Sequence, residues 1–162
     1  MRWWGQLLLF TVAFFVLRGW MQSDMVNGSA PSLQGTPISG GYFSLDTPRT
    51  EPLLLHFWAS WCPVCKLEQE GIESIAQDHA VVTVAMQSGT AMEVEHYLQE
   101  QQMQAATLVD EDGSLSQRFG VSAVPATFIL SPDNQIRFVE RGFTTELGLS
   151  TRIWLTQQLY SR

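Results

Sequence analysis

The sequence predicts an α/β domain built on a central mixed sheet, and three observations support this prediction. Short β-rich runs alternate with amphipathic segments in the order β-α-β-α-β-α-β-β-α along 42–162, which indicates parallel strands joined by helices. The last two β-rich runs are separated only by the turn sequence SPDNQ, which predicts an antiparallel hairpin. An apolar run opens the chain and predicts a membrane-spanning helix ahead of the domain.

The chain begins MRWWGQLLLFTVAFFVLRGWM, in which the only polar residues of 3–17 are Gln6 and Thr11. A helix needs about 20 residues to cross the hydrocarbon core of a bilayer, and the apolar run is close to that length. We therefore predict a membrane anchor at 1–21, with a cleaved signal peptide as the alternative. Residues 22–41 are rich in Ser, Gly, Pro and Asn and are predicted to link the anchor to a domain at 42–162.

The first elements of the domain are predicted from short local patterns. YFSL at 42–45 adds a short edge strand, and PLLLHFW at 52–58 is a continuous apolar run that suits a strand buried on both faces. The segment 62–77 has apolar residues near helical spacing, and Pro63 suits its first turn. Gly71 lies inside this predicted helix and marks a candidate kink.

The remaining elements alternate in the same way. The segment 90–103 is amphipathic, and Met92, Tyr97, Leu98 and Met103 are predicted to face inward. The other predicted elements are strands at 80–86, 106–110, 126–130 and 136–143, a short helix at 114–121 and a closing helix at 145–160.

Length and composition limit the function. With 162 residues, 45% of them hydrophobic, the chain suits one domain plus a tail and can bury a sizeable core. The formal net charge of −7 argues against nucleic acid as a partner.

Both cysteines, Cys62 and Cys65, lie in the stretch HFWASWCPVC, between the predicted buried strand and helix. A disulfide between these cysteines is not expected to serve mainly for stability. The stabilisation from a disulfide grows with the length of the loop that it closes, and this loop is nearly the shortest possible. The N–H groups and partial positive charge at a helix N-terminus favour a thiolate at Cys62, which predicts a nucleophile there. Cys65 lies one turn deeper and is predicted to resolve a mixed disulfide. No bound cofactor is implied, because the pair itself carries the electrons.

Metal binding is the competing interpretation of the cysteines. Structural zinc needs about four ligands, and the three histidines form no pair at the spacing of a zinc finger. Attachment of c-type haem requires His where this chain has Lys66. Copper(I) can be held by two thiolates alone, so a copper(I)-binding module or metallochaperone of the cell envelope is the alternative function.

A second motif, GVSAVPATFIL, places Pro125 directly before the predicted strand 126–130. In a fold with this order of elements, the start of that strand packs beside the CxxC turn. A cis Val124–Pro125 bond would present backbone groups of Val124 for strand-like pairing with an extended substrate. An ordinary trans proline that opens an edge strand is the alternative.

With FWASWCPVC on a strand–helix turn and VPATFIL about 60 residues later, the sequence resembles thioredoxin-fold proteins over 42–160. The anchor, the CKLE after the motif and the extra helix at 90–103 resemble the membrane-tethered TlpA/ResA/CcmG-like oxidoreductases of the bacterial envelope. The WCPVC motif with an anchor also resembles the ScsD-type protein of copper-sensitivity-suppressor systems.

The resemblance implies a thioredoxin-like fold in a single-pass protein of the bacterial inner membrane, with its catalytic domain in the periplasm. It implies thiol–disulfide exchange with protein partners, more as a reductant than as an oxidant, and recharging by a membrane-bound redox partner. By the same resemblance, Cys62 is the nucleophile, Cys65 the resolving thiol, Pro125 the cis-proline and Trp61 the aromatic flanking the site.

Further site residues are predicted around this pair. The resemblance implies proton transfer at Glu68, for which a solvated surface carboxylate is the alternative. His56 stands where thioredoxins have a buried acid, and it is predicted either to accept the proton of the resolving thiol or to be a core histidine. Pro63 and Val64, between the cysteines, and Val124 are the predicted substrate-contacting positions. No proline follows the acidic residue, which weakens assignment to the cytochrome-maturation subgroup.

Overall fold

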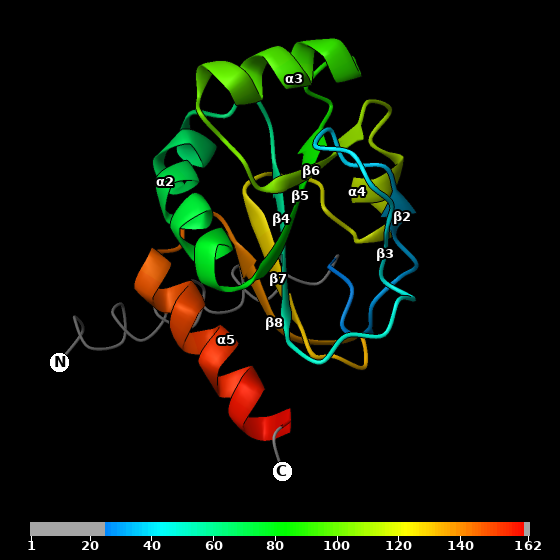
Figure 1. Cartoon of the computed structure of the whole chain (residues 1–162), viewed down its shortest axis with the longest axis vertical. Coiled ribbons are helices and arrows are strands. Elements are labelled where there is room, and N and C mark those ends of the chain that lie inside the picture. Colours follow the sequence, from blue (N-terminus) through cyan, green and yellow to red (C-terminus); the bar gives the residue numbers. More distant parts are fainter. Residues whose placement is uncertain (1–24, 161–162) are drawn as a thin grey trace, which may run out of the picture.

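A computed structural model of the chain describes residues 25–160. The predicted anchor at 1–21 therefore lies outside the described residues. Within 25–160, no helix has the length and apolar character that crossing a membrane requires. The described part of the chain is a layered α/β domain with a mixed sheet in the order β1-β8-β7-β4-β5-β6 (Figure 1).

The predicted buried strand forms the centre of the sheet. All six residues of β4 (Leu53–Trp58) are buried. This strand pairs parallel with β5 (Ala80–Met86) and antiparallel with β7 (Ala126–Leu130). β6 (Ala106–Asp110) continues the sheet in parallel beyond β5, and β8 (Gln135–Arg141) forms the predicted antiparallel hairpin with β7. The continuous apolar run thus predicts its central place correctly, because only a strand covered on both faces needs no polar side.

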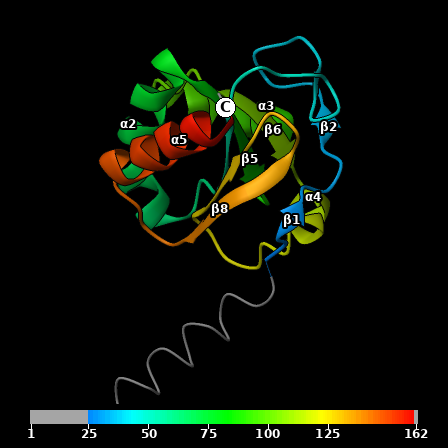
Figure 2. The same cartoon turned by 90° about the horizontal axis from the view of Figure 1, so that it is seen from below.

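Two helices cover one face of the sheet. α2 (Pro63–Asp78) and α5 (Glu146–Tyr160) lie side by side there, whereas α4 lies on the opposite side (Figure 2). Gly71 does not break α2, which is helical through this position. A Cβ atom built on Gly71 would lie 3.2 Å from the Cβ atom of Glu146, so glycine allows the two helices to approach closely. This packing, rather than the candidate kink, accounts for the glycine.

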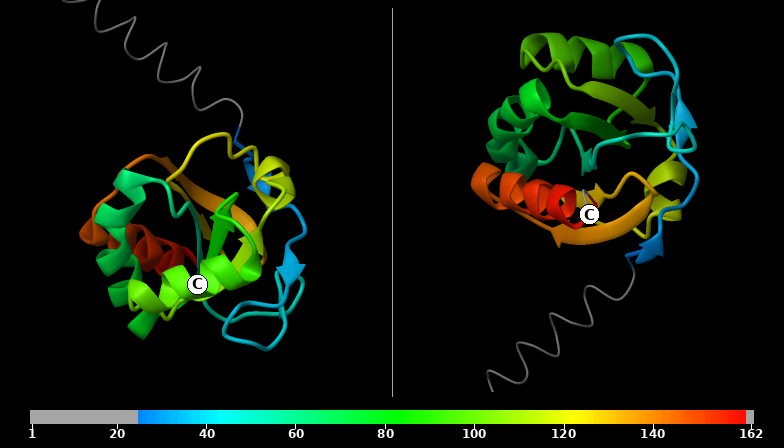
Figure 3. Two further views of the ribbon diagram at one scale, coloured as in Figure 1. Left: turned by 90° about the horizontal axis from the view of Figure 1, so that it is seen from above. Right: turned by 60° about the horizontal axis from the view of Figure 1, so that its bottom comes forward.

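The opposite face is covered by α4 (Ser114–Arg118) and by the N-terminal segment (Figure 3). For residues 25–41 the linker prediction is wrong, because Met25 and Leu33 are buried in the core with exposed fractions of 3% and 1%. The short strands of this segment are β1 (Gly28–Ser29), which pairs with β8, and β2 (Gln34–Gly35), which pairs with β3 (Phe43–Ser44). Met25 and Leu33 are too far apart in the sequence to form a helical or strand period, so the pattern did not predict that they are buried.

The predicted helix at 90–103 is α3 (Ala91–Glu100), which packs over the carboxyl ends of β4 and β5. Val94 and Leu98 face the core, but Met92 is 77% exposed, so its inward placement is wrong. The helix begins with a capping box, in which the Thr90 hydroxyl accepts the N–H of Glu93 and the Glu93 carboxylate accepts the N–H of Thr90. This reciprocal pairing satisfies two amide groups that a helix end leaves free.

Replacement of Thr90 by Ala should lower the free energy of unfolding by about 1 kcal/mol, because the helix loses the cap at its first turn. Thr151→Ala is the matched control, since the Thr151 hydroxyl only donates to the Leu147 carbonyl inside α5, where alanine is the better helix former. Urea unfolding measures both variants. Equal stability of the two variants would contradict a contribution from the capping box.

Candidate active site

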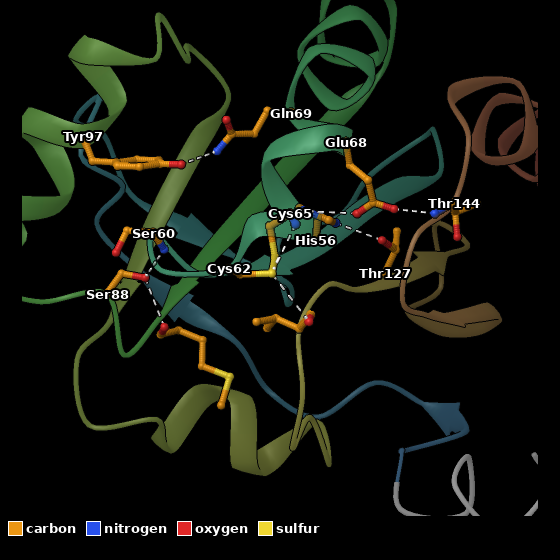
Figure 4. The surroundings of a disulfide bond; sticks show 12 residues. His56, Ser60, Cys62, Cys65, Glu68, Gln69, Ser88, Tyr97, Thr127 and Thr144 are labelled. Carbon is orange, nitrogen blue, oxygen red and sulfur yellow. Dashed lines mark hydrogen bonds and ion pairs between the residues drawn. A yellow bond between two sulfur atoms is a disulfide. The ribbon is translucent and has the colours of Figure 1, made fainter. Parts of the chain in front are cut away.

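The two cysteines are positioned by the junction of β4 and α2. Cys62 is the N-cap residue of α2, and its sulfur accepts the N–H of Cys65 at 3.1 Å. The pair forms a disulfide with the two Cα atoms 5.3 Å apart (Figure 4). Cys62 is 4% exposed and Cys65 is fully buried, so Cys62 is the sulfur closer to solvent. This is the placement that the strand–helix pattern predicts.

The loop before β7 faces the disulfide. The Val124–Pro125 bond is cis, as predicted. The carbonyl oxygen of Val124 lies 3.7 Å from the sulfur of Cys62, which brings together two motifs that are 62 residues apart. The Pro125 carbonyl accepts the N–H of Gly142, so the loop is also fastened to the end of β8. The backbone of Val124 therefore lies directly beside the sulfur of Cys62.

Several large apolar side chains on and near the cysteine segment are exposed. Trp61 is 60% exposed and its indole N–H donates to the carbonyl of Gln87, which fixes the ring beside the site. Val64, between the cysteines, is exposed. Leu67 and Phe143 are also largely exposed, and the sequence did not single them out.

Glu68 is buried one turn beyond Cys65, so the alternative of a solvated surface carboxylate is wrong. Only 4% of its surface is exposed. One carboxylate oxygen, Oε1, accepts the N–H of Thr144, while Oε2 is buried and has no hydrogen bond. Burial raises the pKa of Glu68 to about 7, against the opposing effect of the Thr144 N–H. The carboxyl can therefore gain or lose a proton near neutral pH.

His56 lies next to this oxygen of Glu68. Its Nε2 lies 4.0 Å from Oε2 of Glu68, and its Nδ1 lies 2.9 Å from the hydroxyl of Thr127 (Figure 4). Burial lowers the pKa of His56 to about 4, so the imidazole is neutral at pH 7. Thr127 and Thr144 have no sequence signal of their own. Thr127 follows only from the register of β4 and β7, which places it opposite His56.

A cleft of about 310 Å³ leads from the surface to Glu68. It lies between α2 and the turn before α5, and Leu67, Gly71, Phe143 and Thr144 are among the residues that line it. Glu68 lines the inner side of this cleft, although only 4% of its surface is exposed.

Among residues 25–160, no three side chains of His, Cys, Asp or Glu come together as a metal site. Copper(I) bound by Cys62 and Cys65 alone stays a prediction of the sequence.

Residues 26–139 match the AhpC/TSA family. This chain belongs to the AhpC/TSA family. It is 30% identical over 122 residues to a thioredoxin-like protein of Haemophilus influenzae, covering 74% of this chain and 72% of that protein. It is 26% identical over 138 residues to the thiol:disulfide interchange protein DsbE of Escherichia coli, covering 83% and 72%. The structure of StoA from Bacillus subtilis has the same fold, with a TM-score of 0.67 and 24% identity over 75% of this chain and 96% of that one.

These comparisons confirm the thioredoxin-like fold and the resemblance to TlpA/ResA-like thiol–disulfide oxidoreductases. The AhpC/TSA-family protein described here is therefore a thiol–disulfide oxidoreductase. The narrower ScsD-type assignment stays a prediction.

Proposed function

We propose that this AhpC/TSA-family protein is tethered to the bacterial inner membrane and reduces disulfides of protein partners in the periplasm. One observation carries the chemistry: the Cys62–Cys65 pair lies at the start of α2 and faces the backbone carbonyl of Val124. The predicted anchor at 1–21 and the similarity to DsbE support the location.

The first step uses the reduced pair. The thiolate of Cys62 is stabilised by the N-terminus of α2, where the N–H of Cys65 points at its sulfur. It attacks one sulfur of a substrate disulfide, forms a mixed disulfide and releases the other substrate sulfur as a thiolate. Val124 pairs with the extended substrate backbone, while Trp61, Pro63 and Val64 contact its side chains.

The second step resolves the mixed disulfide. Glu68 accepts the proton of the Cys65 thiol, and neutral His56 supports the carboxylate during this transfer. The Cys65 thiolate then attacks the sulfur of Cys62, which restores the disulfide seen here and releases the second substrate thiolate. Two electrons pass from the cysteine pair to the substrate. A membrane-bound redox partner must return two electrons to Cys62 and Cys65 before the next cycle.

The equilibrium redox potential of the full-length chain against glutathione tests the direction of transfer. A reductant should have a potential near that of thioredoxin, about −270 mV, rather than near that of the oxidant DsbA, about −120 mV. Reduction of insulin by the chain should accompany it. A potential near the oxidant value would reverse the proposed direction. Stoichiometric copper(I) in the reduced chain, without insulin reduction, would favour the alternative of a metallochaperone.

A further inference from the structure

Three buried side chains form a line of polar contacts behind the disulfide (Figure 4). Glu68, His56 and Thr127 have exposed fractions of 4%, 2% and 3%. They come from α2, β4 and β7, so no local pattern brings them together. The Oε2 atom of Glu68 has no hydrogen bond, and Nε2 of His56 is 4.0 Å away. Buried polar atoms without partners are rare, so this gap calls for an explanation.

The hydrogen bonds that these three side chains can form with one another depend on which nitrogen of His56 carries the proton. A neutral imidazole carries one N–H and one lone pair. A charged Glu68 needs a donor at Oε2, which His56 supplies only when its proton is on Nε2. A protonated Glu68 needs an acceptor, which His56 supplies only when its proton is on Nδ1. The hydroxyl of Thr127 can donate to Nδ1 in the first case and accept from it in the second.

We propose that Thr127 is a positioning residue whose hydroxyl lets His56 change tautomer with the charge of Glu68. The inference rests on the proposed function, in which Glu68 accepts the proton of Cys65. In the charged state, Thr127 donates to Nδ1 and Nε2–H donates to Glu68. In the protonated state, Glu68 donates to Nε2 and Nδ1–H donates to Thr127. The trio gains one proton in all, and the imidazole stays neutral in both states.

Other titratable and charged groups near this trio come from α2, α5 and β8. Glu70 and Glu146 line the cleft to Glu68. Glu140 on β8 is the register partner of Thr127 and forms an ion pair with Arg152 of α5, with a distance of 2.7 Å. The partner of His56 on β5 is Thr83, which does not titrate. Arg141 at the end of β8 is the register partner of Ala126, next to Thr127. The two cysteines do not titrate while they form the disulfide.

The test reads the tautomer directly in the oxidised, full-length chain, labelled with ¹⁵N-histidine and held in detergent. The imidazole ¹⁵N shifts of His56, assigned with a His56→Asn variant, distinguish the two tautomers from the imidazolium form. From about pH 5 to about pH 9 the proton of His56 should move from Nδ1 to Nε2. The midpoint should match that of Glu68, whose pKa burial raises to about 7.

Thr127→Val should remove this change. A buried N–H with no acceptor is less tolerable than a buried lone pair, so valine should hold the proton of His56 on Nε2 at every pH. Protonated Glu68 then loses its acceptor, and its midpoint should fall by about one pH unit. Thr127→Ser keeps the hydroxyl and should restore both the change and the midpoint.

A single His56 tautomer across the whole pH range in the parent chain would overturn the proposal. So would a Thr127→Val variant with an unchanged midpoint, since the threonine would then serve packing alone. Both readouts come from the resting disulfide form without substrate. They are therefore independent of whether the protein reduces insulin, which tests the proposed function separately.

Discussion

Cys62→Ser should abolish insulin reduction, with a loss of roughly 10³-fold or more, because no other sulfur can begin the exchange. Cys65→Ala should instead accumulate mixed disulfides with protein partners, since the resolving thiol is missing. Both roles follow from the geometry: Cys62 is the N-cap of α2 and the less buried sulfur, whereas Cys65 is fully buried. Non-reducing gels of envelope extracts, followed by mass spectrometry of the trapped partners, measure the difference.

Alkylation supplies an independent check on the order of the two thiols. In the reduced chain at about pH 6, iodoacetamide should label Cys62 before Cys65, because the helix N-terminus favours the Cys62 thiolate. Faster labelling of Cys65, or mixed disulfides trapped by the Cys62→Ser variant, would reverse the assignment of nucleophile and resolving thiol.

Glu68→Gln should make the protein more stable at alkaline pH. Burial raises the pKa of Glu68 from 4.5 to about 7, so the folded state binds its proton more tightly than the unfolded state does. This contribution to stability is fully present below pH 4.5 and is lost as the pH rises to about 7, where the folded protein must carry a buried charge. The loss amounts to up to roughly 3 kcal/mol. Glutamine is neutral at every pH and should remove this dependence.

Denaturant unfolding of the parent and the variant at about pH 5 and about pH 8 measures the effect. Subtracting the free energy of unfolding of the parent from that of the variant removes the contribution of His56, because its lowered pKa affects both proteins. Glu70→Gln is the matched control, because Glu70 lies on the same helix but is exposed. The idea fails if Glu68→Gln and Glu70→Gln change the pH dependence equally.

The same Glu68→Gln variant should slow resolution of the mixed disulfide by about 10²-fold, the usual effect of losing a general base. The rate of the parent should rise with pH as Glu68 loses its proton, around its pKa of about 7, and this rise should be absent in the variant. Stopped-flow reduction of a model disulfide across this range measures both. If the variant resolved the mixed disulfide as fast as the parent, the proton acceptor would be His56 or water rather than Glu68.

The order of the elements could be predicted from the sequence because each one has a local cause. The apolar run of β4 requires cover on both faces, and SPDNQ joins the strands of the hairpin. Cys62 and Cys65 could be assigned to a helix start because Pro63 suits the first turn. These signals act over a few residues, and the position of the cysteine pair at the start of a helix depends on them alone.

Other features of the fold depend on contacts between segments that are distant in the sequence. Met25 and Leu33 are buried because they pack against residues of the sheet in the core. The segment around them is rich in Ser and Gly, so its composition did not predict their burial. Gly71 is explained by Glu146 on α5, 75 positions later. No local period records such contacts, since two surfaces that meet in space need share no pattern along the chain.

The proton-transfer site shows the division most clearly. Glu68 could be predicted to face the same side as Cys65, because residues three apart on a helix lie close together. Its burial, however, depends on the turn that contains Thr144. The line from Glu68 through His56 to Thr127 depends on the pairing of β4 with β7. The sequence by itself therefore determined the redox chemistry of this protein, and only the tertiary structure decided how its proton is held, because a pKa depends on the neighbours that packing brings to a group.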